Sequence, residues 1–217
     1  WMHDRTNDLQ YAFFNGEGYE SWENIWSIWN QATPRDAEAI RRIGMIYRSF
    51  GDLMFGDWEP HTPTIQEGIY ASKFSKPNLS IFNIINRTAD EIGGPQLHIP
   101  FKPKQRYFDL WRGIEIFPDV ERRDAVLYFT VDPNGFCCIL VVENGKIDAN
   151  LAQFLKRMQP TGGRKLPSFS NRWRVLNQEF LPRTATKKVK TAPAGMALIP
   201  ATKYRFISEG VEIEKSE

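Results

Sequence analysis

Apolar positions recur with helical spacing across residues 33–55 and predict an amphipathic helix there. Thr33 is a natural N-cap, and Pro34 suits the first position of a helix. The apolar positions at spacings of three and four are Ile40, Ile43, Tyr47, Phe50 and Met54. Because an apolar stripe of this length needs a partner, we expect the helix to pack against a larger body.

After about Trp58 the helical period ends, and short runs of β-branched and aromatic residues follow. Prolines at 60, 63 and 77 predict loops before the first run. The runs span residues 79–86, 96–101, 107–116, 125–131 and 136–142. Such runs, bounded by turn residues, predict an antiparallel sheet or sandwich. Asp132-Pro133-Asn134-Gly135 has Pro and Gly at turn positions, so we expect a hairpin between the last two runs.

The last third of the chain is less regular. Asp148 is a candidate N-cap for a short helix over residues 149–158. Prolines, glycines and a basic stretch from Arg183 to Lys190 then predict a linker. Two apolar runs, 196–199 and 204–207, indicate two short strands that open another module.

Residues 11–30 hold the densest group of chemically informative side chains. Seven aromatic residues and three glutamates share this stretch. The apolar run 11–14 is interpreted as the end of a strand, which breaks at Asn15-Gly16 and continues into a loop through Gly18. A loop that brings carboxylates and flat rings together is typical of pockets for sugars and other polar rings.

Composition and charge limit the possible partners. The 217 residues are 41% hydrophobic and 25% charged, so the chain is globular with room for one or two cores. A net charge of +2 gives no electrostatic argument for nucleic acid or for a membrane surface. No apolar run reaches the roughly 18 residues that a membrane span needs. We therefore expect neither nucleic acid nor a membrane as a partner.

The cysteines and histidines predict neither a disulfide nor a metal site. Cys137 and Cys138 are adjacent, and neighbours on a strand point to opposite faces, so we expect two separate buried thiols. No second ligand lies at metal spacing from any of the histidines, which are His3, His61 and His98. We expect no bound metal and no cofactor.

Glu20 and Glu23 are candidate catalytic acids. They are three residues apart, so in a helix they would share a face with Cβ atoms about 5–6 Å apart. Glycoside hydrolysis needs two carboxylates at roughly 5–5.5 Å for retention or 6.5–9.5 Å for inversion. In enzymes built on a (β/α)8 barrel, however, catalytic acids normally come from different strand ends. Hydrogen bonding to the loop backbone, or a role at the first turn of a helix, is the alternative for both residues.

Trp22, Trp26 and Trp29 are spaced as one stripe of a helix. Each indole would bury on the order of 150–250 Å², an amount that favours core packing for at least two of the three. Trp22 lies nearest the glycine loop. It is therefore the candidate platform on which a sugar ring would stack.

Several blocks of this sequence resemble a family of bacterial glycosidase-like proteins. These proteins also carry a formylglycine-generating (sulfatase-modifying factor) domain. The blocks that resemble the closing part of the barrel are Phe13–Gly16, Gly18–Trp26, Ile28–Asn30 and Thr33–Ala39. Arg106–Glu115 is similar to the β-sandwich behind the barrel, and Ala194–Pro200 to the first strand of the formylglycine-generating module.

The sequence departs from this family at informative positions. The family pattern does not require an acid at Glu17, and it more often has histidine at the position of Arg112. Residues 201–203 lack the expected glycines. The cysteines and metal ligands of an active formylglycine-generating domain would lie beyond Glu217, and most of the barrel would lie before Trp1. We therefore expect a fragment of a longer parent protein, without formylglycine-generating activity.

The resemblance implies an α+β fold in several parts. A helical remnant of a (β/α)8 barrel would occupy residues 1–57. An antiparallel β-sandwich would follow at 58–148, then a short helix and linker at 149–191. The first strands of a third domain, similar to the formylglycine-generating enzyme, would occupy 192–217.

The same resemblance implies a carbohydrate-active, glycoside-hydrolase-like parent that acts on or binds a glycan. The catalytic candidates are Glu20 and Glu23. The candidates for substrate binding are Asn15, Tyr19, Trp22 and Asn24. Carbohydrate and the remaining domains of the parent chain are the expected partners, and we expect this chain alone to be inactive. The alternative is a non-catalytic β-sandwich that serves as a scaffold or glycan-binding module beside a formylglycine-generating-type enzyme.

Overall fold

The computed structural model describes residues 4–19, 32–172, 182–205 and 207 of the chain. The chain divides into two compact units, Trp1–Leu176 and Asn177–Glu217. All helices and strands of the described residues belong to the first unit. Residues 182–205 of the second unit are exposed and carry neither helix nor strand.

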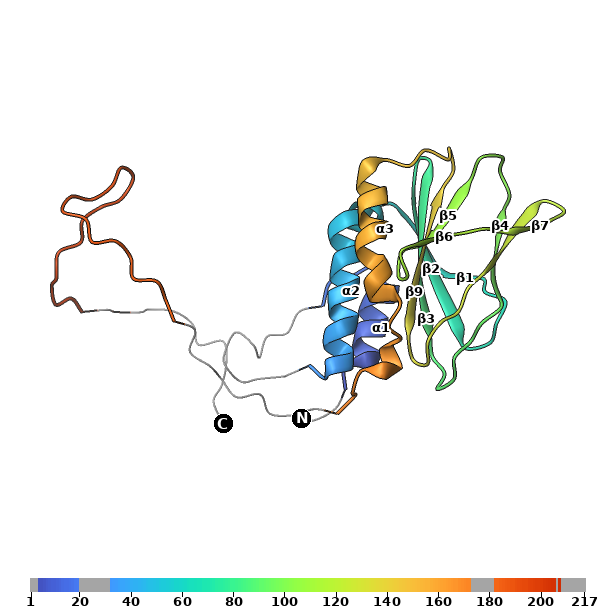
Figure 1. Cartoon of the computed structure of the whole chain (residues 1–217), viewed down its shortest axis with the longest axis horizontal. Coiled ribbons are helices and arrows are strands. Elements are labelled where there is room, and N and C mark those ends of the chain that lie inside the picture. The colour runs from blue at the N-terminus through green and yellow to red at the C-terminus, as the bar shows by residue number, and fades with distance from the viewer. Residues whose placement is uncertain (1–3, 20–31, 173–181, 206, 208–217) are drawn as a thin grey trace. The chain divides into compact units, whose positions relative to one another are not determined.

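A six-stranded antiparallel sheet forms the centre of the first unit (Figure 1). In spatial order its strands are β1 (Asp57–Thr62), β2 (Ile69–Lys76), β3 (Leu79–Asn86), β9 (Phe136–Val142), β5 (Arg106–Asp109) and β6 (Ile114–Ile116). A smaller antiparallel sheet consists of β4 (Pro95–Pro100), β8 (Asp124–Tyr128) and β7 (Asp119–Glu121), again in spatial order. The two sheets lie face to face.

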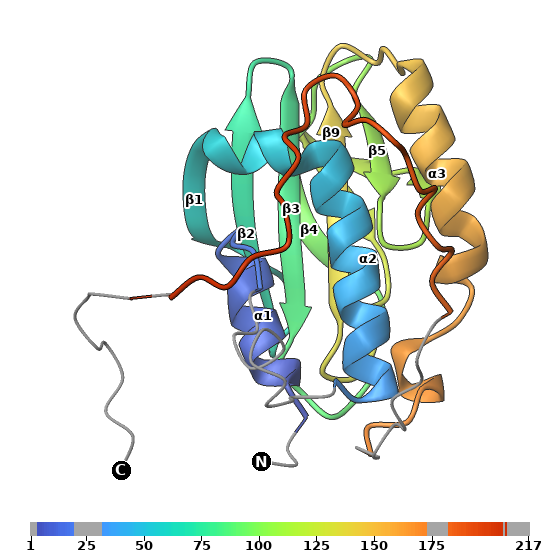
Figure 2. The same cartoon turned by 90° about the vertical axis from the view of Figure 1, so that its left-hand side faces the viewer.

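Three α-helices lie side by side over the other face of the larger sheet (Figure 2). They are α1 (Thr6–Phe14), α2 (Pro34–Phe50) and α3 (Ala149–Gly162). Short 3-10 helices follow two of them, η2 (Gly51–Phe55) after α2 and η3 (Leu166–Ser168) after α3. The first unit therefore has three layers, with the larger sheet between the helices and the smaller sheet.

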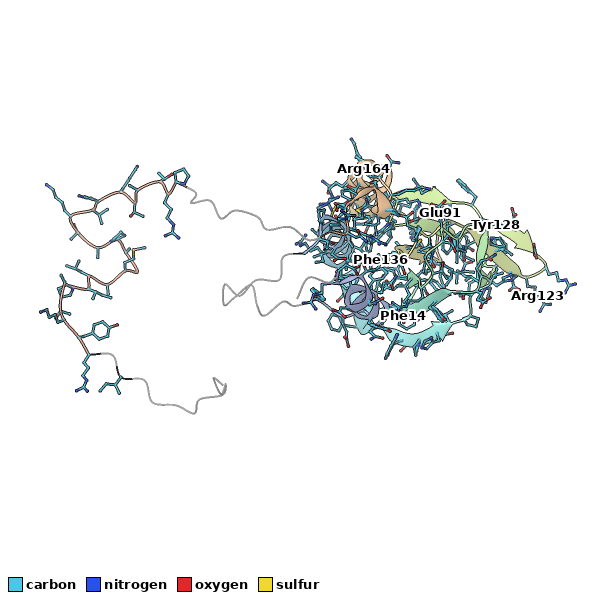
Figure 3. The ribbon with its side chains drawn as sticks, turned by 90° about the horizontal axis from the view of Figure 1, so that it is seen from below. Phe14, Glu91, Arg123, Tyr128, Phe136 and Arg164 are labelled. Atoms are coloured by element: carbon cyan, nitrogen blue, oxygen red, sulfur yellow. The ribbon has the colours of Figure 1, made fainter. Side chains whose placement is uncertain are left out.

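Two hydrophobic cores separate these layers. The helix-side core joins Phe13 of α1, Ile46 of α2 and Phe154 of α3 to one face of the larger sheet. Phe136 of β9 belongs to this core and lies in the interior in Figure 3. The inter-sheet core contains the opposite face of the larger sheet and the inner face of the smaller one.

Cys137 and Cys138 follow the prediction made for them. Both are free and buried. Cys137 belongs to the inter-sheet core and Cys138 to the helix-side core, because successive side chains of β9 point to opposite faces.

The coarse fold class and several elements are as predicted. The described residues combine helices with antiparallel sheet, and the predicted runs 79–86 and 136–142 coincide with β3 and β9. The Thr33 hydroxyl accepts a hydrogen bond from the backbone N–H of Asp36 at the start of α2. The Asp148 carboxylate accepts one from the N–H of Leu151 at the start of α3. Each cap satisfies a donor that the helix itself leaves unpaired.

Four residues of the apolar stripe predicted over 33–55 pack against the helix-side core (Ile43, Tyr47, Phe50 and Met54), but this stripe is not the most buried face of α2. The buried positions are Asp36, Ala39, Arg42 and Ile46. Ile40 is 36% exposed, and Ile43 is only half-buried. Arg42 is buried because its guanidinium finds partners: it donates to Glu38 at 2.7 Å and to the carbonyl of Arg164 at 2.6 Å. It also lies 5.3 Å from the ring centroid of Trp111.

The turn at residues 132–135 forms, but the predicted hairpin is wrong. The N–H of Gly135 donates to the carbonyl of Asp132 at 2.9 Å, which closes the turn. The strands on either side, β8 and β9, belong to different sheets, so the segment crosses between layers. The side chain of Asn86 holds the segment to the end of β3, since its amide donates to the carbonyls of Val131 and Asp132.

Three further predictions from the sequence require correction. The run 11–14 belongs to helix α1, not to a strand, because Thr6, Leu9, Gln10 and Phe13 form one buried helical face. The passage around Pro60 contains β1 and β2; Pro60 is tolerated because β1 is an edge strand. The strands predicted from 196 onwards are absent from residues 182–205, where no neighbouring strand pairs with them.

No helix in the described part of the chain is both long and apolar enough to cross a membrane.

Candidate functional site

The glycine loop predicted from the sequence begins as the C-terminal cap of α1. Gly16 has φ of +72°, the left-handed region that favours glycine. Its N–H donates to the carbonyl of Phe13 at 3.1 Å, and the N–H of Glu17 donates to that of Ala12 at 2.8 Å. These two bonds define a Schellman motif, which satisfies the last carbonyls of the helix. The motif fixes the direction in which residues 16–19 leave α1.

Two hollows border this loop. The larger has a volume of about 430 Å³ and is lined by Gly16, Gly18, Tyr47, Gly51, Asp52, Met54 and Phe55. The smaller, of about 150 Å³, lies between α1 and α2 and is lined by Leu9, Ala12, Phe13, Glu17, Gly18, Tyr19, Ile40, Ile43, Gly44 and Tyr47. Gly18 and Tyr47 contribute to both. We name the residues of these two linings together the loop site.

Tyr47 of α2 is the best-anchored polar side chain of the loop site. Its hydroxyl donates a hydrogen bond to the carbonyl of Phe13 at 3.1 Å and accepts one from the side-chain amide of Asn83 at 3.4 Å. Its ring stacks against that of Phe13, with centroids 6.0 Å apart. Burial raises the pKa of Tyr47 well above its ordinary value, so the hydroxyl stays protonated and serves as a hydrogen-bonding group rather than as a base.

Two carboxylates border the loop site, one at each hollow. Glu17 lines the smaller hollow and is exposed. Asp52 lines the larger hollow and forms an ion pair with Lys76 at 2.6 Å. Exposed carboxylates of this kind can accept hydrogen bonds from ligand hydroxyls.

Two of the six predicted site residues lie in the described part of the chain. Tyr19 is 39% exposed and lines the smaller hollow. Asn15 is exposed at the end of α1 and does not line either hollow. Glu20, Trp22, Glu23 and Asn24 lie outside the described residues.

The sequence did not predict a row of aromatic side chains on β1 and β2. Trp58 is 52% exposed, and its indole lies parallel to the ring of Phe74, with centroids 6.1 Å apart and planes 4° apart. The indole N–H donates to the Ser72 hydroxyl at 2.7 Å. His61 continues the row, since its ring centroid lies 5.1 Å from that of Phe14 and 6.4 Å from that of Tyr70. Pro60 was interpreted as part of a loop, so the alternating side-chain directions of a strand at β1 were not predicted.

These aromatic side chains lie on the helix side of the larger sheet. Phe14, at the end of α1, points toward the strands β1 and β2 in Figure 3. Trp58 is held flat by its stacking partner and by its hydrogen bond, while its other surface faces solvent. A fixed, half-exposed indole offers a flat apolar surface to the C–H face of a ring-shaped ligand.

The polar groups near Trp111 are engaged in structural ion pairs. The carboxylate of Asp109 is buried and accepts two hydrogen bonds from Arg112. The guanidinium donates one at 3.0 Å, and the backbone N–H of Arg112 donates the other at 2.9 Å. Burial raises the pKa of Asp109, against the opposing effect of Arg112. Glu115 forms two bonds of 2.7 Å with Arg106. Within the described ranges, no group of three His, Cys, Asp or Glu residues is arranged to hold a metal ion.

Comparisons with known proteins give matches among solved structures only. No family model matches the chain, and no curated protein matches it. An α-amylase from Anoxybacillus is similar over 65% of the chain at 13% identity, with a TM-score of 0.42. A GH30 endoxylanase from Clostridium papyrosolvens is similar over 66% at 11% identity and a TM-score of 0.37. A trehalose-6-phosphate hydrolase from Bacillus licheniformis is similar over 48% at 15% identity and a TM-score of 0.31.

The chain is much shorter than these similar structures. It spans 33% of the α-amylase, 40% of the endoxylanase and 18% of the trehalose-6-phosphate hydrolase. Glycoside hydrolases are among the solved structures that are similar to part of the chain, at low identity and partial coverage.

Proposed function

We propose that this chain is part of a carbohydrate-active, glycoside-hydrolase-like protein that acts on or binds a glycan. The observation that supports this most directly is the loop site. Its residues combine an anchored tyrosine hydroxyl, the half-exposed Tyr19 and the carboxylates of Glu17 and Asp52 around a glycine loop. Sugar recognition requires this combination of aromatic surface and hydrogen-bonding groups.

The proposal includes the division of the chain inferred from the sequence. Residues 1–57 would be the end of a (β/α)8 barrel, 58–148 a β-sandwich and 149–191 a helix and linker. Residues 192–217 would begin a formylglycine-generating-enzyme-like domain. Support for a missing barrel comes from the hollow between α1 and α2, where Ile40 is 36% exposed and Ile43 is half-buried. Further strands and helices of the parent would bury these side chains.

The roles proposed for single residues follow the same scheme. Glu20 and Glu23 would be the catalytic carboxylates of the parent. Asn15, Tyr19, Trp22 and Asn24 would bind the sugar. This chain would have no hydrolytic activity alone, because a barrel supplies its catalytic groups from several strand ends.

A non-catalytic glycan-binding module is the second candidate function. The observation that favours it is the Trp58 platform, which belongs to the sheet and needs no residue from a barrel. Such a module would bind glycan without hydrolysis.

Binding is tested by electrophoresis of the full chain in native gels that contain starch, xylan or hydroxyethylcellulose. We expect at least one of these polysaccharides to retard the chain. Tyr19→Ala should weaken retardation by about two- to tenfold, the effect of one aromatic contact. Tyr128→Ala is the matched control, because Tyr128 is 42% exposed but lies on β8. Mobility unaffected by all three polysaccharides would count against the proposed function.

Catalysis is tested separately in the full-length parent. Hydrolysis of the retained polysaccharide is measured for the parent and for its Glu20→Gln and Glu23→Gln variants. We expect at least one substitution to abolish turnover while binding persists. If both variants keep full turnover, the catalytic assignment is wrong. A parent that binds but does not hydrolyse any of the polysaccharides would identify the module instead.

A further inference from the structure

A second cavity lies on the opposite side of the larger sheet from the loop site. It has a volume of about 560 Å³ and opens between β4 and one end of the strands β1, β2, β3 and β9. Its lining residues include Glu59, Lys73, Ser80, Phe82, Val141 and Glu143. A neighbouring hollow of about 620 Å³ shares Lys73, Ser80 and Glu143 with it. We name the two together the sheet groove.

The floor of the sheet groove is apolar and well anchored. Phe82 of β3 and Val141 of β9 line it, and both belong to the inter-sheet core. Ile65 and Ile99 add apolar surface at the sides. Because Phe82, Val141 and Ile99 belong to the sheets and pack in their core, the floor is formed before any ligand arrives. A volume of about 300–1,000 Å³ with such a floor is typical of ligand pockets.

The rim of the sheet groove carries two ion pairs, and Asp57 and Lys76 add one charge of each sign at the neighbouring hollow. Lys73 contacts Glu59 at 3.2 Å, and Lys102 contacts both oxygens of Glu143 at 2.9 and 3.0 Å. All four side chains are between 31% and 56% exposed. Ion pairs this exposed contribute little to folding, about 0–1 kcal/mol, so a ligand can replace part of each pair at small cost.

The charges of the rim select the chemistry of a ligand. Each ammonium lies beside a carboxylate, so the two pairs carry no net charge. An anion attracted by a lysine would be repelled by the adjacent glutamate. A cation attracted by a glutamate would be repelled by the adjacent lysine. A hydroxyl group donates one hydrogen bond and accepts others, so it can bind between the two members of a pair. A ligand with many hydroxyls and no charge fits best.

We propose that the sheet groove binds a neutral oligosaccharide. The C–H faces of its rings would lie against Ile65, above the floor formed by Phe82 and Val141. Its hydroxyls would bind at the Lys73–Glu59 and Lys102–Glu143 pairs. The choice of carbohydrate rests on the proposed function, whereas the preference for a neutral polyhydroxylated ligand comes from the groove itself.

The test is a titration of the ¹⁵N-labelled full chain with maltohexaose, cellohexaose and xylohexaose, followed by amide chemical shifts. We expect one of them to shift the amides of Lys73, Ser80 and Val141. Lys73→Met and Glu143→Gln should each weaken this binding about tenfold, as expected for a lost hydrogen bond to a charged group. Lys165→Met is the control, since Lys165 also forms an exposed ion pair, with Glu91, but does not line the groove.

Three outcomes would overturn the proposal. Shifts confined to the loop site, with unchanged affinity in Lys73→Met and Glu143→Gln, would reject the groove and leave the proposed function intact. Stronger binding of a charged trigalacturonate than of every neutral hexasaccharide would reject the predicted ligand chemistry. No shift with any hexasaccharide would also reject the groove, while the proposed function would still be decided by retention on polysaccharides.

Discussion

Gly16 shows how one residue determines the start of the loop site. Its φ of +72° suits glycine, and a Cβ atom added there would lie 2.7 Å from the ring of Phe74. Gly18, two residues later, has nothing within 4 Å of such an atom. The sequence indicated a break at Asn15-Gly16, but not that the break ends a helix. The φ angle and the contact with Phe74 both come from the tertiary structure.

Gly16→Ala should therefore destabilise the first unit, and Gly18→Ala should not. We expect a loss of about 1–2 kcal/mol for Gly16→Ala, because alanine is strained at positive φ and its methyl group meets Phe74. Gly18→Ala should change stability by less than about 0.5 kcal/mol. Urea unfolding followed by tryptophan fluorescence measures both. Equal losses in the two variants would contradict this account of the cap.

At the scale of elements, the sequence predicted best where local patterns and burial agree. The strand β9 is a continuous apolar run and β3 is mostly apolar, and the caps Thr33 and Asp148 mark true helix starts. The α1 helix was misread because its buried face mixes polar and apolar residues. The sheet groove could not be predicted from the sequence, since its rim joins residues that are distant in the sequence. Only pairing of the strands brings Lys73 near Glu59 and Lys102 near Glu143.

Helix α2 offers a direct comparison of a buried and an exposed arginine. Arg41 and Arg42 both bind Glu38 at 2.7 Å, but the side chain of Arg41 is 47% exposed and that of Arg42 only 1%. Arg42→Ala should cost about 1–3 kcal/mol, because it leaves the carbonyl of Arg164 without this donor, while Glu38 keeps its bonds to Arg41. Arg41→Ala should cost about 0–1 kcal/mol.

The measurement is the free energy of unfolding in urea for the two variants and the unchanged chain. A difference between the variants of less than about 1 kcal/mol would show that burial of Arg42 adds little. It would also show that the cation–π contact with Trp111 is weak.

At the scale of the whole molecule, the three layers place two candidate binding surfaces on opposite faces of one sheet. The loop site lies on the helix side and the larger-sheet cavity of about 560 Å³ on the side of the smaller sheet, while Phe55 lines both the loop site and the neighbouring hollow of the sheet groove. The second unit adds a different feature, a row of exposed apolar side chains without secondary structure. Leu198 is 81% exposed and Ile199 is 84% exposed. Large apolar side chains exposed in this way favour association with other surfaces.

We expect the chain expressed alone to self-associate. Incomplete cover of Ile40 and Ile43 on α2, together with Leu198 and Ile199, provides the driving force. Sedimentation velocity should show larger species as the protein concentration rises, and a Leu198→Ser, Ile199→Ser double variant should reduce them. A single monomeric species at all concentrations would argue against the missing barrel of the proposed function.

The adjacent thiols of β9 can report the order in which the layers of this protein unfold. Cys138 is shielded by the helices, whereas Cys137 is shielded by the smaller sheet. Burial raises the pKa of both thiols, so a thiol reagent reaches each one only after its own cover has opened. The order in which the two sulfurs are modified during slow denaturation therefore reports which outer layer detaches first.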